Sequence, residues 1–167
     1  MSESQPCGSC TVCCHDLAVE ELSKPSRTPC RHLCSTGCGI YRDETKPKIC
    51  ASYECVWKHS DFSREFRPDK CGILFEFQSD WGGEDFIHIR AREVRKNAMK
   101  KPKGISALQA MIKTQLVIVK CRYEQPETSS GFIFPREMTE DQAQIVQRIV
   151  SKMSDKGLIK KLHQIDL

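Results

Sequence analysis

Nine of the first 55 residues are cysteines, and no other feature of the chain restricts its folding as strongly. Four of them lie in CGSCTVCC at residues 7–14, and the other five lie in CRHLCSTGC at 30–38 and CASYEC at 50–55. Excluding cysteine, residues 1–70 contain 16 apolar side chains, whereas residues 71–167 contain 38. The first part buries too little carbon to offset the entropy that a chain loses on folding. We therefore expect cross-links to hold it together.

Metal–thiolate bonds are the cross-links that we expect. The chain begins MSESQPCGSC, which lacks the basic and apolar stretches of a secretory signal, and no apolar run reaches the roughly 18 residues that span a bilayer. These features predict a cytoplasmic protein without a membrane partner, and in that compartment thiols stay reduced and cysteine clusters favour metals. Eleven cysteines are also an odd number, so a complete set of disulfides would leave one over. A disulfide-bonded secreted scaffold is the alternative.

The spacing of the first cysteines suits chelation. Cys7 and Cys10 form a C-x2-C pair, in which Gly8 permits the tight turn that brings both sulfurs to one side. Cys10 and Cys13 repeat this spacing. Cys13 and Cys14 are adjacent, and in an extended segment their side chains would point to opposite faces and reach separate metal centres. A strained vicinal disulfide is the alternative for this pair.

The last cysteines of the group, Cys50 and Cys55, lie on a predicted short helix. Thr45 is the candidate cap of this helix, and Pro47 suits its first turn. The side chains predicted to face inward are Ile49, Tyr53 and Trp57.

These stretches together resemble the YkgJ-type cysteine-cluster family, a zinc- or iron-chelating domain. The matching segments are CGSCTVCC, CRHL, CGIY and KPKICASYEC followed by tryptophan, so the resemblance covers residues 7–57 and extends loosely to 67–77. The chain departs from the family pattern at Lys46, where the family often has arginine, and at Cys34, which is extra. The metal ligands that the resemblance implies are Cys7, Cys10, Cys13, Cys14, Cys30, Cys38, Cys50 and Cys55.

Zinc is the predicted metal, and an iron–sulfur cluster is the alternative. Eight thiolates could form two tetrahedral zinc sites, and nine could form one multinuclear cluster with bridging sulfurs. The C-x2-C-x2-C run supplies the first three ligands of a ferredoxin-type iron–sulfur site, but the C-P that completes that signature is missing. His15 and His32 lie beside ligand cysteines and could each replace a sulfur, although a surface position or one outside the ligand shell is favoured for both.

Residues 61–167 have the composition of an ordinary globular domain. Strands and helices are predicted in the order ββαββα, at 71–77, 86–94, 105–114, 116–124, 129–135 and after Thr139. Gln142 lies three residues after that threonine, as in a capping box. The chain is therefore predicted to be α+β: a cysteine-rich, metal-stapled segment, residues 1–60, packed with a small, mainly antiparallel sheet and two helices. Cys71 and Cys121 fall in apolar strand patterns and are expected to be buried.

One stretch, residues 90–103, is strongly basic. It reads RAREVRKNAMKKPK and contains seven basic residues against Glu93 alone. Clustered positive charges bind phosphate backbones or acidic partners. The net charge of the chain is only +4 and the run has no interleaved aromatic residues, so a solvated strand end and loop is favoured. Nucleic-acid binding through this run is the alternative.

The search for catalytic motifs is negative. The chain contains no Gly-x-Ser-x-Gly elbow, no phosphate-binding glycine loop and no recognisable pair of catalytic carboxylates. The first hypothesis is a non-enzymatic metalloprotein whose metal is mainly structural and organises a surface for a protein or small-molecule partner. The second is an iron–sulfur enzyme in redox or group-transfer chemistry, such as protein modification. Flagellin lysine methylases are similar in carrying a related cysteine cluster, but this chain lacks their extra length, so their activity is not transferred.

Overall fold

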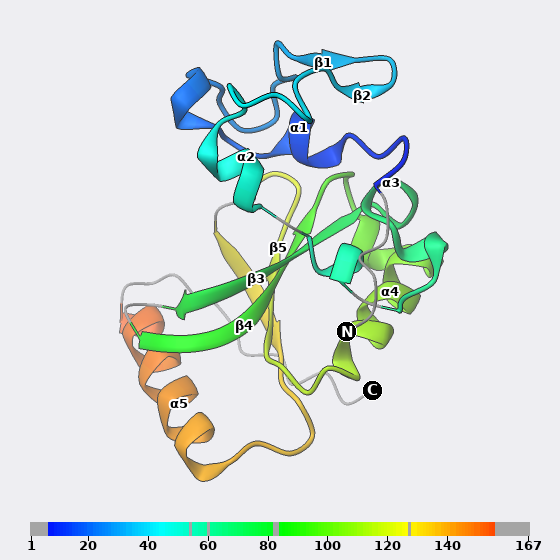
Figure 1. The fold of residues 1–167 in the computed structure, drawn as a ribbon. Helices are drawn as coiled ribbons and strands as arrows, with labels where there is room; N and C mark the ends of the chain where they lie inside the picture. Colours follow the sequence, from blue (N-terminus) through cyan, green and yellow to red (C-terminus); the bar gives the residue numbers. More distant parts are fainter. Residues whose placement is uncertain (1–6, 54, 60, 82–83, 127, 156–167) are drawn as a thin grey trace.

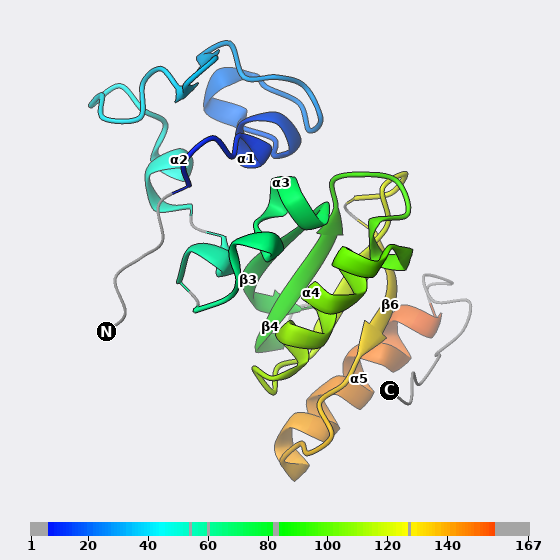
Figure 2. The ribbon, with the colours of Figure 1, turned by 90° about the vertical axis from the view of Figure 1, so that its right-hand side faces the viewer.

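The chain folds as a mixture of helices and strands, as the sequence predicts, but its strands form two sheets where one is predicted (Figure 1). The structure is a computed structural model, and it describes residues 7–53, 55–59, 61–81, 84–126 and 128–155. Figures 1 and 2 show the cysteine-rich segment, coloured blue to cyan, as a layer at one end of the larger sheet. Both views place helix α5 at the opposite end of the molecule. Within the described residues, no helix is both long and apolar enough to cross a membrane.

The cysteine-rich segment consists of short elements joined by turns. Its regular elements are α1 (Val12–Asp16), β1 (Leu33–Cys34), β2 (Gly37–Cys38) and α2 (Lys48–Ser52). β1 and β2 form a two-stranded antiparallel sheet. None of these elements is long enough to be stable alone, because isolated helices shorter than about 12 residues and isolated hairpins are marginal in water. Their conformation therefore depends on what they pack against or bind.

The predicted helix through Cys50 and Cys55 is shorter than expected: α2 (Lys48–Ser52) contains Cys50, but Cys55 lies beyond its end. α2 begins directly after Pro47, and the amide of Thr45 is bonded instead to Asp43 Oδ1 at 2.8 Å, so Thr45 is not the cap. The helix cannot begin before Pro47, because the residue that precedes a proline, here Lys46, is kept out of the helical conformation. The expectation that Ile49 faces inward is also wrong, since its side chain is 50% exposed.

A four-stranded sheet forms the centre of the rest of the chain. Its strands lie in the order β3 (Ile73–Trp81), β4 (Glu84–Glu93), β5 (Ile118–Cys121) and β6 (Ser129–Ile133). Two of the three pairings are antiparallel, but β4 and β5 are parallel. α4 (Pro102–Ile112) makes the crossover that a parallel pair requires, and Pro102 occupies its first turn. α4 thus begins three residues earlier than the apolar pattern predicts.

The two faces of this sheet have separate apolar cores. Ile73, Phe75 and Ile89 lie on the face that α4 covers with Leu108 and Met111. On the opposite face the core consists of Phe86, Val117, Val119, Phe132, Val146 and Ile149. The last two belong to α5 (Glu140–Asp155), which begins with the predicted capping box. The amide of Gln142 donates to Thr139 Oγ1 at 3.2 Å, and the amide of Thr139 donates to Gln142 Oε1 at 3.0 Å.

The cysteine-rich segment packs on the part of this second face that α5 leaves uncovered. Side chains alternate along a strand, so Glu76 and Arg92 share the face of Phe86. Both are buried, at 4% and 5% exposed, and Arg92 Nε lies 3.1 Å from Glu76 Oε2. From the cysteine-rich segment, the Tyr53 hydroxyl donates to Glu76 Oε1 at 3.3 Å. A buried polar network therefore joins the segment to the sheet.

Candidate metal centre

A cavity of about 150 Å³ lies between the cysteine-rich segment and the sheet. On one side it is lined by Leu74 of β3 and by Pro68. On the other side it is lined by apolar side chains of the segment, such as Leu17 and Val19. The cysteines that line it are Cys7, Cys10, Cys13, Cys14, Cys30, Cys38, Cys50 and Cys55. These are the eight that the resemblance implies as ligands. The structure thus gathers, in one place, thiols that lie up to 48 positions apart in the sequence.

Of the described cysteines, Cys34, Cys71 and Cys121 lie outside the lining of this cavity. Cys34 is exposed on β1, and its thiol bonds to Gly37 O at 3.2 Å. Cys71 and Cys121 are buried at 3% and 1% exposed, as their apolar surroundings in the sequence predict. Cys71 is the last residue of α3 (Pro68–Cys71) and not part of a strand, because the chain turns at Gly72, whose φ is +79°.

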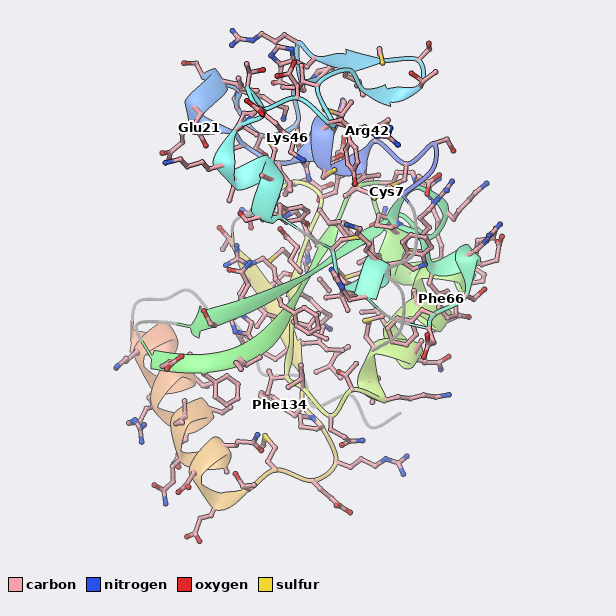
Figure 3. The ribbon with its side chains drawn as sticks, viewed as in Figure 1. Cys7, Glu21, Arg42, Lys46, Phe66 and Phe134 are labelled. Carbon is pink, nitrogen blue, oxygen red and sulfur yellow. The ribbon has the colours of Figure 1, made fainter. Side chains whose placement is uncertain are left out.

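The C-x2-C turn at Cys7 and Cys10 has the predicted shape. The Cys10 amide donates to Cys7 O at 3.1 Å, and Gly8 has a φ of +57°, a value that favours glycine. Arg67 fixes the turn from outside, because its guanidinium donates to Cys7 O at 3.1 Å and to Ser9 Oγ at 3.2 Å. Figure 3 shows Cys7 where the segment meets the rest of the chain.

Cys13 and Cys55 lie beside this turn. The pKa of Cys55 is raised to about 11, first by burial and also by the nearby thiols of Cys7 and Cys10. The pKa of Cys13 is raised first by a hydrogen bond to Cys14, then by burial, and also by Cys7 and Cys10. The thiols that raise one another's pKa beside this turn therefore come from both ends of the segment.

A second group of thiols surrounds Cys14. The Cys30 amide donates to Cys14 O at 2.9 Å, and the β1–β2 pairing places Cys38 opposite Leu33. The Cys38 thiol acts on that of Cys14 and contributes to lowering its pKa. Burial raises the pKa of Cys50, and the thiols of Cys14, Cys30 and Cys38 raise it further. The neighbours of Cys50 are thus different from those of Cys55, only five positions away.

Cys13 and Cys14 are not in an extended segment, which corrects the geometry expected for them. They lie in α1, where adjacent side chains are about 100° apart instead of on opposite faces. Hydrogen bonding between the two thiols raises the pKa of Cys13 and lowers that of Cys14. With a further contribution from Cys38, the pKa of Cys14 is lowered to about 6. The adjacent pair is where the two groups of thiols meet.

A buried lysine lies beside the second group. Lys24 is 7% exposed, and its ammonium donates to His15 O at 3.1 Å, to Pro25 O at 3.3 Å and to Leu17 O. Burial lowers the pKa of Lys24, whereas Cys30, Asp16, Cys14 and Cys50 act in the opposite direction. Sequence reasoning misses Lys24, because a single lysine in a polar loop carries no local sign that it will be buried.

The cysteine side chains around the cavity are chemically suited to bind zinc or iron. Thiolates are the ligands of structural zinc sites and of iron–sulfur clusters. No group of three Cys, His, Asp or Glu side chains forms a ready coordination site among the described residues, so binding would require the thiols to rotate. His15 and His32 are outside the cavity lining, and the His15 ring lies instead 3.3 Å from Asp16 Oδ2. The structure therefore brings the cysteines together without either histidine.

Four of the seven basic residues in the stretch at 90–103 have partners within the chain. Arg92 is buried in its ion pair, and Arg95 donates to two backbone carbonyls of α3, at 3.0 and 2.7 Å. Lys96 and Lys103 each lie beside a glutamate, at 3.1 and 2.5 Å. This arrangement supports the interpretation of the stretch as a strand end and loop.

We expect no specific nucleic-acid binding through this stretch at physiological salt. Weak binding at low salt should disappear as salt rises, because it depends on counterion release. Fluorescence anisotropy with a labelled duplex would measure this, and neutralising Arg95, Lys96, Lys100 and Lys101 to glutamine should flatten the salt dependence. A tight, sequence-selective complex of the unaltered chain would contradict the expectation.

The chain matches no protein-family model, no curated protein and no solved structure. The resemblance to the YkgJ-type family accordingly rests on the cysteine pattern of residues 7–57 and stays a prediction. Function has to be inferred from the chemistry of the cavity.

Proposed function

We propose that this chain is a metal-binding cysteine-cluster protein of the YkgJ type, in which zinc bound by thiolates holds the cysteine-rich segment in its fold. The observation that carries this proposal is the content of the cavity: eight of the described cysteines line it, and the three that the family pattern does not include lie elsewhere. Buried packing accounts for a few cysteines in a core, but not for eight around one small cavity.

Zinc would supply what the segment lacks. α1, α2 and the β1–β2 hairpin contain two to five residues each, and few apolar side chains of this segment are fully buried. Bonds between a metal and thiolates contribute on the order of 10 kcal/mol to the folding of small metal domains. A zinc ion bound by four thiolates has no open coordination position, so its role here would be structural.

The metal would also organise a surface. Tyr41 and Ile49 line the cavity and are nevertheless 57% and 50% exposed, so they lie at its rim. Exposed apolar side chains that are held in place by a metal offer contacts to a protein or small-molecule partner. The proposed function is therefore a metal-organised binding module.

Anaerobic purification followed by elemental analysis tests the proposal. We expect zinc, no acid-labile sulfide and a colourless protein. Iron with sulfide and a brown colour would instead support the iron–sulfur alternative. Serine at Cys50 should reduce the metal content, because a hydroxyl stays protonated and replaces a thiolate poorly.

Serine at Cys34, Cys71 or Cys121 provides the matched control for that variant. Each removes one thiol, but none of these three lines the cavity, so metal content should be unchanged. A chain that contains neither zinc nor iron after anaerobic purification, and takes up neither, would contradict the proposal. Metal loss from the Cys34 variant would instead point to a nine-thiolate cluster.

A further inference from the structure

We infer that one loop without cysteines, residues 19–27, sets the positions of the metal-binding thiols on α1 and α2. This segment is called the clamp loop, and its positioning residues are Lys24 and Glu21. The inference rests on the proposed function, because it takes the cysteines of α1 and α2 to be metal ligands. It adds which residues outside the cysteine set determine how tightly the metal is bound.

The clamp loop caps the end of α1, the helix with the adjacent cysteines. The last carbonyls of a helix have no partner inside it. The Lys24 ammonium donates to two of them, His15 O at 3.1 Å and Leu17 O. The Arg27 amide donates to Asp16 O, the carbonyl between them, at 3.3 Å. Three successive carbonyls at the end of α1 are thus bonded to the clamp loop.

The ammonium of Lys24 is buried at this helix end. Its side chain is 7% exposed and lines the cavity, and burying a charge is costly unless hydrogen bonds replace those to water. An ammonium has three donors, and the third contact of Lys24 is with Pro25 O at 3.3 Å. All three acceptors are backbone carbonyls, so the ammonium fixes the path of the main chain after α1.

The clamp loop also holds the beginning of α2, the helix that carries Cys50. Pro47 precedes this helix and has no N–H, so the first amides to need a partner are those of Lys48 and Ile49. The Glu21 carboxylate accepts from both, at 3.3 Å and 3.4 Å. Figure 3 shows Glu21 beside α2. A carboxylate is favourable there, because the amides at a helix start carry partial positive charge.

The clamp loop is itself closed and anchored. The amides of Val19 and Lys24 each donate to the carbonyl of the other residue, at 2.9 and 3.0 Å, which closes the loop between them. Arg27 joins the loop to the rest of the chain. Its guanidinium lies 3.8 Å from the centre of the Tyr123 ring and donates to Glu93 O at 3.3 Å. Both cysteine-bearing helices are thus fixed to one closed loop, and that loop is fixed to β4.

These contacts act on the thiols through the helices that carry them. The hydrogen bonds of Lys24 and Glu21 are to backbone atoms at the ends of α1 and α2. The thiols carried by the two helices are Cys13, Cys14 and Cys50. Groups that orient metal ligands from outside the ligand shell typically change metal affinity by about 10- to 100-fold when they are replaced. Replacing either positioning residue should therefore weaken metal binding in a chain that keeps all its thiols.

Zinc affinity of the full chain, measured by competition with a chromogenic chelator, tests Lys24. Lys24→Met removes the ammonium but keeps a side chain of similar length, and the affinity should fall about 10- to 100-fold. Lys46→Met is the matched control, because Lys46 also lines the cavity but its ammonium lies over the Tyr41 ring, 4.7 Å from its centre. The control should lose less than about five-fold, as for a charge that stays partly exposed. An unchanged affinity in Lys24→Met, or equal losses in both variants, would overturn positioning by its hydrogen bonds.

Glu21 is tested by variants that disturb no buried side chain, so they test the inference even if Lys24→Met does not fold. Glu21→Ala should lower zinc affinity about two- to five-fold, the effect of a charge at a helix start. Glu21→Gln keeps an acceptor oxygen and should recover part of the loss. Glu20→Ala removes the same charge from an exposed neighbour in the clamp loop and should leave the affinity unchanged. Equal affinities in the Glu20 and Glu21 variants would contradict the role of Glu21.

Cobalt in place of zinc separates positioning from stability, because its visible absorption bands depend on the arrangement of the thiolates around it. At saturating cobalt, Lys24→Met should shift these bands. Met111→Ala, which leaves a void in the core under α4, should lower stability and leave the bands unchanged. Unshifted bands in the Lys24 variant would overturn a positioning role. An unaltered chain that binds neither zinc nor cobalt would refute the proposed function first, so the two failures are distinguishable.

Discussion

Complete removal of the metal is expected to unfold the cysteine-rich segment while the sheet of β3 to β6 survives. Under the proposed function the segment depends on metal bonds worth on the order of 10 kcal/mol, whereas the rest of the chain has its own apolar cores on both faces of the sheet. Limited proteolysis should therefore cut within residues 7–59 after treatment with a strong chelator and spare residues 73–133. The remaining sheet should then unfold in a step of its own at higher denaturant, since it is no longer coupled to the segment.

Returning zinc under reducing conditions provides the control for this experiment. It should restore protease resistance in residues 7–59, because binding and folding of this segment are one process. Restoration by magnesium, which prefers oxygen ligands, is not expected. Unchanged resistance of the segment after complete metal removal would show that packing alone holds it.

Arg92→Leu is expected to lower the free energy of unfolding by about 3–5 kcal/mol, the cost of leaving a buried charge unpaired. Burial raises the pKa of Glu76 in spite of the attraction of Arg92, so desolvation outweighs the ion pair at this carboxyl. Without Arg92, the Glu76 carboxyl would still be buried away from water but would lose much of the attraction that offsets this burial. Urea denaturation of the zinc-loaded chain measures the change.

Two further variants identify the origin of that loss. Glu76→Leu/Arg92→Leu removes both charges and should cost much less than Arg92→Leu alone. Lys96→Leu removes a basic residue from an exposed pair at 3.1 Å and should cost less than about 1 kcal/mol. A loss of similar size in all three variants would mean that the buried pair has no special role.

Through Glu76, the substitution of Arg92 should also affect the stability of the cysteine-rich segment. Tyr53 donates to the same carboxylate and lies between Cys50 and Cys55 in the sequence. This carboxyl is therefore one of the contacts that join the two parts of the chain, along with the hydrogen bonds from Arg67 to Cys7 O and Ser9 Oγ. Their stabilities should be coupled in the zinc-loaded protein and separate in the metal-free one.

Local patterns were sufficient to predict most of the elements of the C-terminal part. The strand patterns predict β3 to β6 within a few residues, and the threonine and glutamine three positions apart predict the capping box of α5. These features depend on neighbours in the sequence, through side-chain alternation and hydrogen bonds within one turn. The C-x2-C spacing likewise predicts the turn at Cys7 and Cys10.

Only the tertiary structure decided which distant residues became neighbours. Spacing alone does not indicate that eight cysteines up to 48 positions apart line one cavity, because this depends on where the chain reverses between them. The burial of Lys24, the exposure of Ile49 and the parallel pairing of β4 with β5 are decided in the same way. A sequence pattern reports the periodicity of one segment, whereas burial and grouping depend on what packs against that segment after the chain has folded.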